Sequence, residues 1–180
     1  LIKHYTTITE EAKVPAILYN VPSRTGCSLA ASTVAYLAKN AEYVTAIKEA
    51  SGDISHVADI MYACDGAIDL YSGNDDQIVP ILSLGGKGVI SVLSNVAPKE
   101  THDIVALFLE GKIKESRELQ LKALPLVHAL FSEVNPIPVK AALNLMGKEV
   151  GPLRLPLTEM EAAHQEVLAE EMKKFGIKLA

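Results

Sequence analysis

The sequence predicts an α/β fold in which a parallel sheet is followed by a group of helices. Between residues 16 and 110, short β-branched apolar runs alternate four times with segments of helical spacing. This alternation is typical of parallel strands joined by helical crossovers. After Gly111 only helical segments follow. We therefore expect residues 1–110 to form the sheet with its helices, and residues 111–180 to form a helical domain.

Each element has a local signal. The first strand is a short apolar run ended by Pro22, and Ser28 is the expected N-cap of the helix that follows it. Asn74 and Asp75 provide a similar capping start, and Pro98 lies in the first turn of its helix. The expected strands are 16–21, 43–47, 68–71 and 88–92, and the expected helices are 1–13, 28–39, 55–64, 77–84, 98–110, 112–131, 138–146 and 158–175.

Four such units are half of an eight-stranded barrel, or a small open doubly wound sheet. No Gly-x-Gly-x-x-Gly follows the first strand, so a dinucleotide-binding fold has no support. An isolated half-barrel would expose two strand edges, which natural proteins avoid. The chain also begins with Leu1 rather than Met, and its first residues predict a helix already in progress, without an N-cap. We therefore expect sequence upstream of Leu1.

Composition excludes several classes of protein. The chain is 49% hydrophobic and 22% charged, a balance typical of globular proteins. Its net charge of −5, without a block of like charges, argues against nucleic acid or an anionic membrane as partners. No apolar run reaches the roughly 18 residues that span a bilayer, and no secretory signal opens the chain. The expected location is the cytoplasm.

Metal chemistry and nucleophilic serine chemistry have no sequence support. Cys27 and Cys64 form no Cys-x-x-Cys pattern. The histidines are scattered and none lies at ligand spacing from another ligand. No Gly-x-Ser-x-Gly is present either. We expect no metal site and no disulfide scaffold.

Chemistry in parallel α/β folds gathers at the carboxyl ends of strands. Tyr19 and Lys48 lie one strand–helix–strand unit apart, so they are expected at the same end of neighbouring strands. Burial favours the neutral form of an amine, which is the nucleophile for a carbonyl. Lys48 is therefore a candidate nucleophile, and Tyr19 a candidate proton donor and acceptor. The common alternatives are a lysine whose head reaches water and a core tyrosine.

Other strand-end residues have weaker signals. Arg24 lies in a Pro-x-Arg-x-Gly loop, where it can bind a substrate carboxylate or pair with a surface acid. Gly73 could allow close approach of backbone to a ligand, although a simple turn is the favoured interpretation. Gly85 and Gly86 are expected to end a helix and turn the chain.

Two segments carry a resemblance to a known family. Residues 19–26 (Tyr-Asn-Val-Pro-Ser-Arg-Thr-Gly) and 46–53 (Ala-Ile-Lys-Glu-Ala-Ser-Gly-Asp) resemble the dihydrodipicolinate synthase family of the N-acetylneuraminate lyase superfamily. Segments 71–75, 85–92, 135–140 and 153–157 agree with it, so the resemblance runs essentially from end to end. The fold that it implies is the carboxy-terminal half of a (β/α)8 TIM barrel followed by a small helical domain.

The resemblance also implies a site and a reaction. Lys48 matches the lysine that forms an imine with pyruvate, and Tyr19 the tyrosine that relays protons. Arg24 matches the arginine that binds the carboxylate of L-aspartate 4-semialdehyde. Gly73 and Ile90 match positions whose backbone lines the pyruvate pocket. The implied lyase makes 4-hydroxy-tetrahydrodipicolinate on the diaminopimelate route to lysine, with no cofactor beyond the covalent lysine, as a homotetramer.

Two alternatives remain open. Sister aldolases acting on N-acetylneuraminate or keto-deoxy sugars share the tyrosine and lysine motifs, although the Pro-Ser-Arg-Thr-Gly of residues 22–26 resembles the synthase more. The family's amino-terminal half, with its pocket threonines and lysine feedback site, has no counterpart in this sequence. The chain alone is therefore also interpreted as a non-catalytic fragment, held by its own amino-terminal half as a partner.

Overall fold

A computed structural model describes all 180 residues, and the chain divides into two compact units, Leu1–Ile90 and Ser91–Ala180. Each unit has a hydrophobic core of its own. The sequence suggested a later division, after residue 110. The reason for the difference is α6 (Pro98–Leu109), which packs against α7 (Ile113–Leu130) in the second unit. The buried hydroxyl of Ser116 in α7 donates a 2.6 Å hydrogen bond to the carbonyl of Ile104 in α6.

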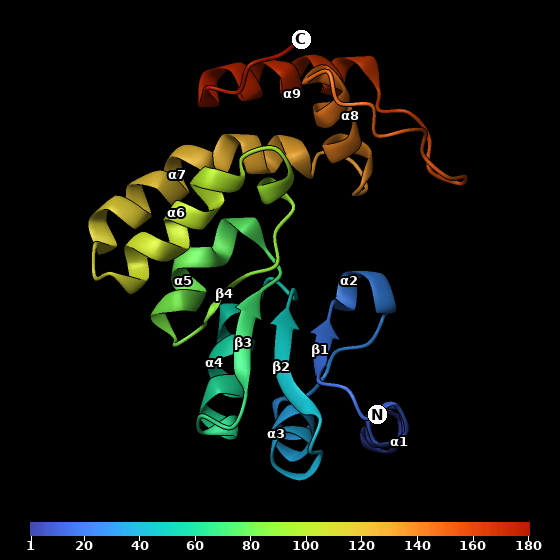
Figure 1. Ribbon diagram of the computed structural model, residues 1–180, viewed down its shortest axis with the longest axis vertical. Helices are drawn as coiled ribbons and strands as arrows, with labels where there is room; N and C mark the ends of the chain where they lie inside the picture. The colour runs from blue at the N-terminus through green and yellow to red at the C-terminus, as the bar shows by residue number, and fades with distance from the viewer. The chain divides into compact units, whose positions relative to one another are not determined.

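The first unit contains a parallel sheet in the order β1-β2-β3-β4 (Figure 1). This confirms the α/β fold with a parallel sheet. The strand bounds are β1 (Ala16–Asn20), β2 (Val44–Glu49), β3 (Asp69–Ser72) and β4 (Gly88–Val89). Most bounds agree with the expected ones to within one residue, and two differ by more: β2 continues through Lys48 and Glu49, and β4 is much shorter than 88–92. Both β1 and β4 are edges of this sheet.

Helices cover one face of the sheet. The helix bounds in this unit are α1 (Ile2–Ala12), α2 (Pro22–Thr25), α3 (Ala31–Asn40), α4 (Ile54–Cys64) and α5 (Ile78–Ser83), with a 3-10 turn η1 (Asp75–Gln77) before α5. The fully buried Leu18, Ile47 and Leu70, one from each of three strands, share a core with Leu37 of α3 and Ile60 of α4. Because side chains alternate along a strand, the next residues, Tyr19, Lys48 and Tyr71, lie on the opposite face.

One expected cap was wrong, and the other lies at the expected position without a capping bond from the Asn74 side chain. Ser28 does not cap α3, because the chain stays extended through Ala30, which is the N-cap residue with φ −63° and ψ 144°. The Asn74 side chain makes no capping bond either, and its backbone N–H instead donates to the Ser72 hydroxyl. The cap that does form was not predicted: one carboxylate oxygen of Asp53 accepts from the N–H groups of Ser55 and His56 at the start of α4.

The second unit is helical, as expected for the end of the chain. After a 3-10 turn η2 (Leu93–Asn95), its helices are α6, α7, α8 (Ile137–Leu145) and α9 (Ala162–Phe175). The start of α9 was predicted too early, at 158, because Glu161 is extended and forms the N-cap. Buried residues of α7, α8 and α9, with Leu93 and Met160, form its core. None of the helices in the chain has the length and apolarity required to cross a membrane.

Candidate active site

Tyr19 and Lys48 lie side by side at the carboxyl ends of β1 and β2. They are register partners across the two parallel strands, and Tyr71 of β3 is the next partner of Lys48. The Nζ atom of Lys48 is 4.3 Å from the centroid of the Tyr19 ring. This confirms the predicted juxtaposition of the two side chains. The contact is with the face of the ring, an arrangement that attracts a cationic amine and fixes its position.

The two side chains differ in exposure. Lys48 is half-buried, and Tyr19 is 44% exposed although it lies within a strand. Ile17, two residues earlier on the same face of β1, is 52% exposed. The face that carries Tyr19 and Lys48 is therefore exposed along the β1 edge.

Gly73 follows β3 and makes room for Lys48. A Cβ atom at this position would lie 2.5 Å from the Cβ of Ala50 and 3.0 Å from Cε of Lys48. The N–H of Gly73 donates a 2.7 Å hydrogen bond to the carbonyl of Glu49. The glycine thus lets the end of β3 pack directly against the lysine stem.

Ile90 and Arg24 lie at the same end of the sheet. The N–H of Ile90, just after β4, donates a 2.8 Å hydrogen bond to the carbonyl of Ser72 at the end of β3. Arg24 lies on the short helix α2, which follows β1 directly and ends at Gly26 with φ +66°. Its side chain is exposed. All five sequence-predicted site residues therefore belong to segments at the carboxyl ends of the strands.

A second row of residues lies on the other face of the sheet, and the sequence interpretation gave it no role. Asn20, Glu49 and Ser72 are the last residues of β1, β2 and β3, and they pair in register. All three are at most 2% exposed. Each directly follows a member of the Tyr19–Lys48–Tyr71 row, so strand alternation is the signal that could have found them.

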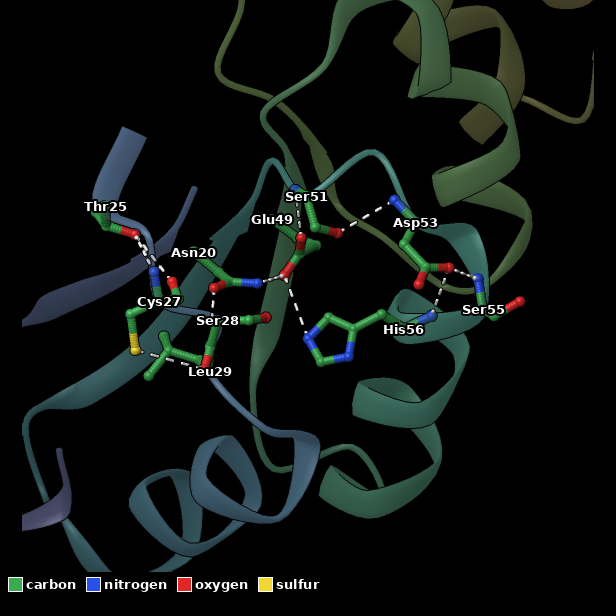
Figure 2. Close-up of polar contacts among 10 residues, drawn as sticks. All are labelled: Asn20, Thr25, Cys27, Ser28, Leu29, Glu49, Ser51, Asp53, Ser55 and His56. Atoms are coloured by element: carbon green, nitrogen blue, oxygen red, sulfur yellow. Dashed lines mark hydrogen bonds and ion pairs between the residues drawn. The ribbon is translucent and has the colours of Figure 1, made fainter. Parts of the chain in front are cut away.

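The carboxylate of Glu49 is the centre of this second row (Figure 2). Its Oε2 accepts a 2.8 Å hydrogen bond from Nδ2 of Asn20, and its Oε1 accepts a 2.6 Å bond from the N–H of Ser51. The Oδ1 of Asn20 accepts a 2.9 Å bond from the N–H of Leu29. Nε2 of His56 lies 4.0 Å from Glu49 Oε2.

Other chemically capable groups lie apart from these rows. No group of three His, Cys, Asp or Glu side chains is arranged to hold a metal ion. Both cysteines are free thiols, with Cys27 exposed and Cys64 buried. Burial raises the pKa of the Cys64 thiol above its usual value, and Lys39 opposes this in smaller measure.

The helical unit has a cavity of its own, of about 420 Å³. It is lined by residues of α8, by the segment from Gly151 to Met160, and by Gln165 of α9. At its wall, Nζ of Lys140 donates a 2.7 Å hydrogen bond to the carbonyl of Pro152. None of the predicted site residues lines it.

Known proteins resemble this chain along nearly its whole length. A synthase from Lachnoclostridium phytofermentans, 4-hydroxy-tetrahydrodipicolinate synthase, is 60% identical over 177 residues, which are 98% of this chain and 60% of that protein. The solved dihydrodipicolinate synthase of Thermotoga maritima is 42% identical with a TM-score of 0.95 over 97% of this chain and 60% of its own. A solved dihydrodipicolinate synthase from Acinetobacter baumannii, complexed with pyruvate, is 38% identical, with a TM-score of 0.93. The match covers 98% of this chain and 60% of that protein.

The chain thus spans about 60% of the length of the relatives that it matches. The model of the dihydrodipicolinate synthetase family matches residues 1–175. A match of this extent, together with the parallel sheet and the paired Tyr19 and Lys48, assigns the family that the two sequence motifs suggested. The chain belongs to the dihydrodipicolinate synthetase family.

Proposed function

We propose that Lys48 is the nucleophile of a lyase that condenses pyruvate with L-aspartate 4-semialdehyde. The observation that carries the proposal is the Lys48 amine held 4.3 Å from the Tyr19 ring at the carboxyl ends of two parallel strands. A member of the same family, from Acinetobacter baumannii, was solved complexed with pyruvate, and the name of the Lachnoclostridium relative supports the product, 4-hydroxy-tetrahydrodipicolinate.

The proposed chemistry begins with attack of the neutral Lys48 amine on the keto carbon of pyruvate. Loss of water gives the imine, and loss of a methyl proton gives an enamine. The enamine carbon forms a bond to the aldehyde carbon of the semialdehyde. The amino group of the semialdehyde then attacks the imine carbon, which closes the ring and releases the Lys48 amine.

Tyr19 is proposed as the proton relay for imine formation and cyclisation. The closeness of its ring to the Lys48 amine supports this role, and the relay further requires the hydroxyl to come within hydrogen-bond reach of the reacting groups. Arg24 is proposed to bind the carboxylate of the semialdehyde, since a guanidinium matches a carboxylate in bidentate fashion. The backbones of Gly73 and Ile90 are proposed to line the pyruvate pocket.

The proposal extends to the setting of the reaction. No cofactor is required, because the lysine supplies the covalent intermediate. The route served is that of diaminopimelate and lysine, in the cytoplasm, and the assembly is a homotetramer. The identity of 60% to a protein named as the synthase favours this enzyme over a sister aldolase for N-acetylneuraminate or keto-deoxy sugars.

The sheet is proposed to be the carboxy-terminal half of a (β/α)8 barrel, with residues 1–110 as the barrel portion. The order β1-β2-β3-β4 leaves β1 and β4 as edges, and Tyr19 is 44% exposed along the first of them. Four further strands would cover that face. This observation also favours the second candidate, in which the 180-residue chain alone does not turn over and requires an amino-terminal half as partner.

A condensation assay tests the proposal and separates the alternatives. The chain is assayed alone and joined to the part of the Lachnoclostridium relative that it does not match. We expect the chimera, and not the chain alone, to consume pyruvate with L-aspartate 4-semialdehyde. Lys48→Arg should abolish this activity, whereas the matched Lys39→Arg, at an exposed lysine of α3, should retain it. Cleavage of N-acetylneuraminate or a keto-deoxy sugar in place of the condensation would contradict the synthase assignment.

A further inference from the structure

Glu49 is a buried acid that the proposed chemistry does not use. It directly follows Lys48, it points to the opposite face of β2, and it is 2% exposed. A buried carboxylate is costly unless hydrogen bonds compensate for the lost water. The burial of the Glu49 carboxylate therefore requires compensation, and its hydrogen-bond partners provide it.

Each oxygen of the carboxylate accepts a hydrogen bond, and Nε2 of His56 lies 4.0 Å from Oε2 without bonding to it. The Oδ1 of Asn20 accepts from the backbone N–H of Leu29, which orients the amide so that its Nδ2 donates to Glu49 Oε2. The other donor, the N–H of Ser51, belongs to the backbone and cannot be reversed. An isosteric glutamine would place its own NH₂ group against one of these donors in either orientation. The hydrogen bonds from Asn20 and Ser51 thus favour a carboxylate over an amide at this position.

These bonds join the ends of the two strands that carry the candidate catalytic pair. Asn20 follows Tyr19, and Glu49 follows Lys48, so the Asn20–Glu49 bond bridges the strands one residue beyond that pair. The backbone continues the link, because the N–H of Ala50 donates a 2.9 Å bond to the carbonyl of Asn20. Because Glu49 and Lys48 are consecutive residues of β2, a shift or twist of the backbone at Glu49 also displaces Lys48.

We propose that Glu49 is a positioning residue: its carboxylate, bonded to Asn20 and Ser51, fixes the end of β2 so that the Lys48 amine stays against the Tyr19 ring. This inference rests on the proposed role of Lys48 as the imine-forming residue. Preorganised positioning of a nucleophile contributes directly to rate, and a displacement of about 1 Å can cost on the order of a hundredfold.

The first test measures the position of Lys48 without requiring activity. Lysines of the 180-residue chain are reductively methylated with ¹³C-formaldehyde, and the Lys48 signal is assigned from its absence in Lys48→Arg. Ring current from Tyr19 should shift this signal upfield of the other lysines. In Glu49→Gln and in Asn20→Ser the Lys48 signal should move toward the signals of the other lysines. The control Thr9→Val, an isosteric loss of another buried hydrogen bond, should leave it unchanged.

The second test measures pyruvate trapping by borohydride in the same variants of the chimera. We expect Glu49→Gln to lower the trapping rate by roughly ten- to a hundredfold at saturating pyruvate, with a smaller change in the half-saturating concentration. A loss no greater than in Thr9→Val, with an unmoved Lys48 signal, overturns the inference and leaves the proposed function intact. Absence of trapping in the unsubstituted chimera counts against the proposed function, while the Lys48 signal of the chain still decides the position of the amine.

If both variants fail to fold, amide hydrogen exchange of the unsubstituted chain decides. The N–H groups of Ala50 and Gly73, which bond to the strand ends, should then exchange as slowly as that of the core residue Leu70. Rapid exchange at both positions would mean that the strand ends open freely, and it would overturn the positioning role.

Discussion

Gly73, just after β3, lies beside the Lys48 side chain of β2, and the space there admits no side chain at residue 73. A Cβ there would lie 3.0 Å from Cε of Lys48 and 2.5 Å from Cβ of Ala50. The shape of the candidate site therefore depends on a glycine whose backbone, rather than any side chain, contacts the lysine stem.

Replacement of this glycine should both destabilise the fold and displace the lysine. We expect Gly73→Ala to lower the free energy of unfolding by about 1–3 kcal/mol, the usual cost of overpacking. Urea denaturation measures this change. The double variant Gly73→Ala/Ala50→Gly removes the 2.5 Å contact and keeps the contact with Lys48. It should recover stability while the Lys48 signal remains displaced, and a signal at its original position would refute the direct contact.

The ring and the hydroxyl of Tyr19 should have separable roles. Tyr19→Phe retains the ring beneath the amine, so the Lys48 signal of methylated protein should stay upfield. Pyruvate trapping should nevertheless slow by about a hundredfold or more, because the proposed proton relay is lost. Tyr19→Leu should lose the upfield shift of the Lys48 signal and should also slow pyruvate trapping. Normal trapping by Tyr19→Phe would show that the hydroxyl has no part in imine formation.

Asp53 should stabilise the first unit through the start of α4. Its side chain accepts from the N–H groups of Ser55 and His56, so Asp53→Ala should cost about 1 kcal/mol of unfolding free energy. The matched control is Asp53→Asn, because asparagine caps helices nearly as well. An equal loss in both variants would mean that charge, and not the cap, accounts for the effect.

Much of the fold and part of the site were predictable from sequence. The β-branched runs located the strands, and their spacing placed Tyr19 and Lys48 together. The bonds among Asn20, Glu49 and Leu29 were not predictable, because they join residues distant in sequence through buried side chains. Local patterns also misplaced helix starts. Ser28 is a good N-cap residue by type, but the backbone stays extended past it.

The buried thiol of Cys64 should make stability fall at alkaline pH. Its folded pKa is raised by burial above the ordinary value of 9.0, so the folded chain retains a proton that the unfolded chain loses. This thiol therefore leaves stability unchanged below about pH 9 and lowers it as the pH rises from there toward the folded pKa, by at most about 1.4 kcal/mol per pH unit. Unfolding of Cys64→Ala from pH 7 to 11 should lack this part of the slope, whereas Cys27→Ser should retain it.

The central claim is that Lys48 attacks the keto carbon of pyruvate, and mapping of the trapped adduct tests it most directly. The protein is incubated with pyruvate, reduced with borohydride, digested and analysed by peptide mass spectrometry. The account predicts a single reduced pyruvate adduct, on Lys48, which is absent from Lys48→Arg and present in Lys39→Arg. An adduct on another lysine, or none on a chimera that catalyses the condensation, would contradict it.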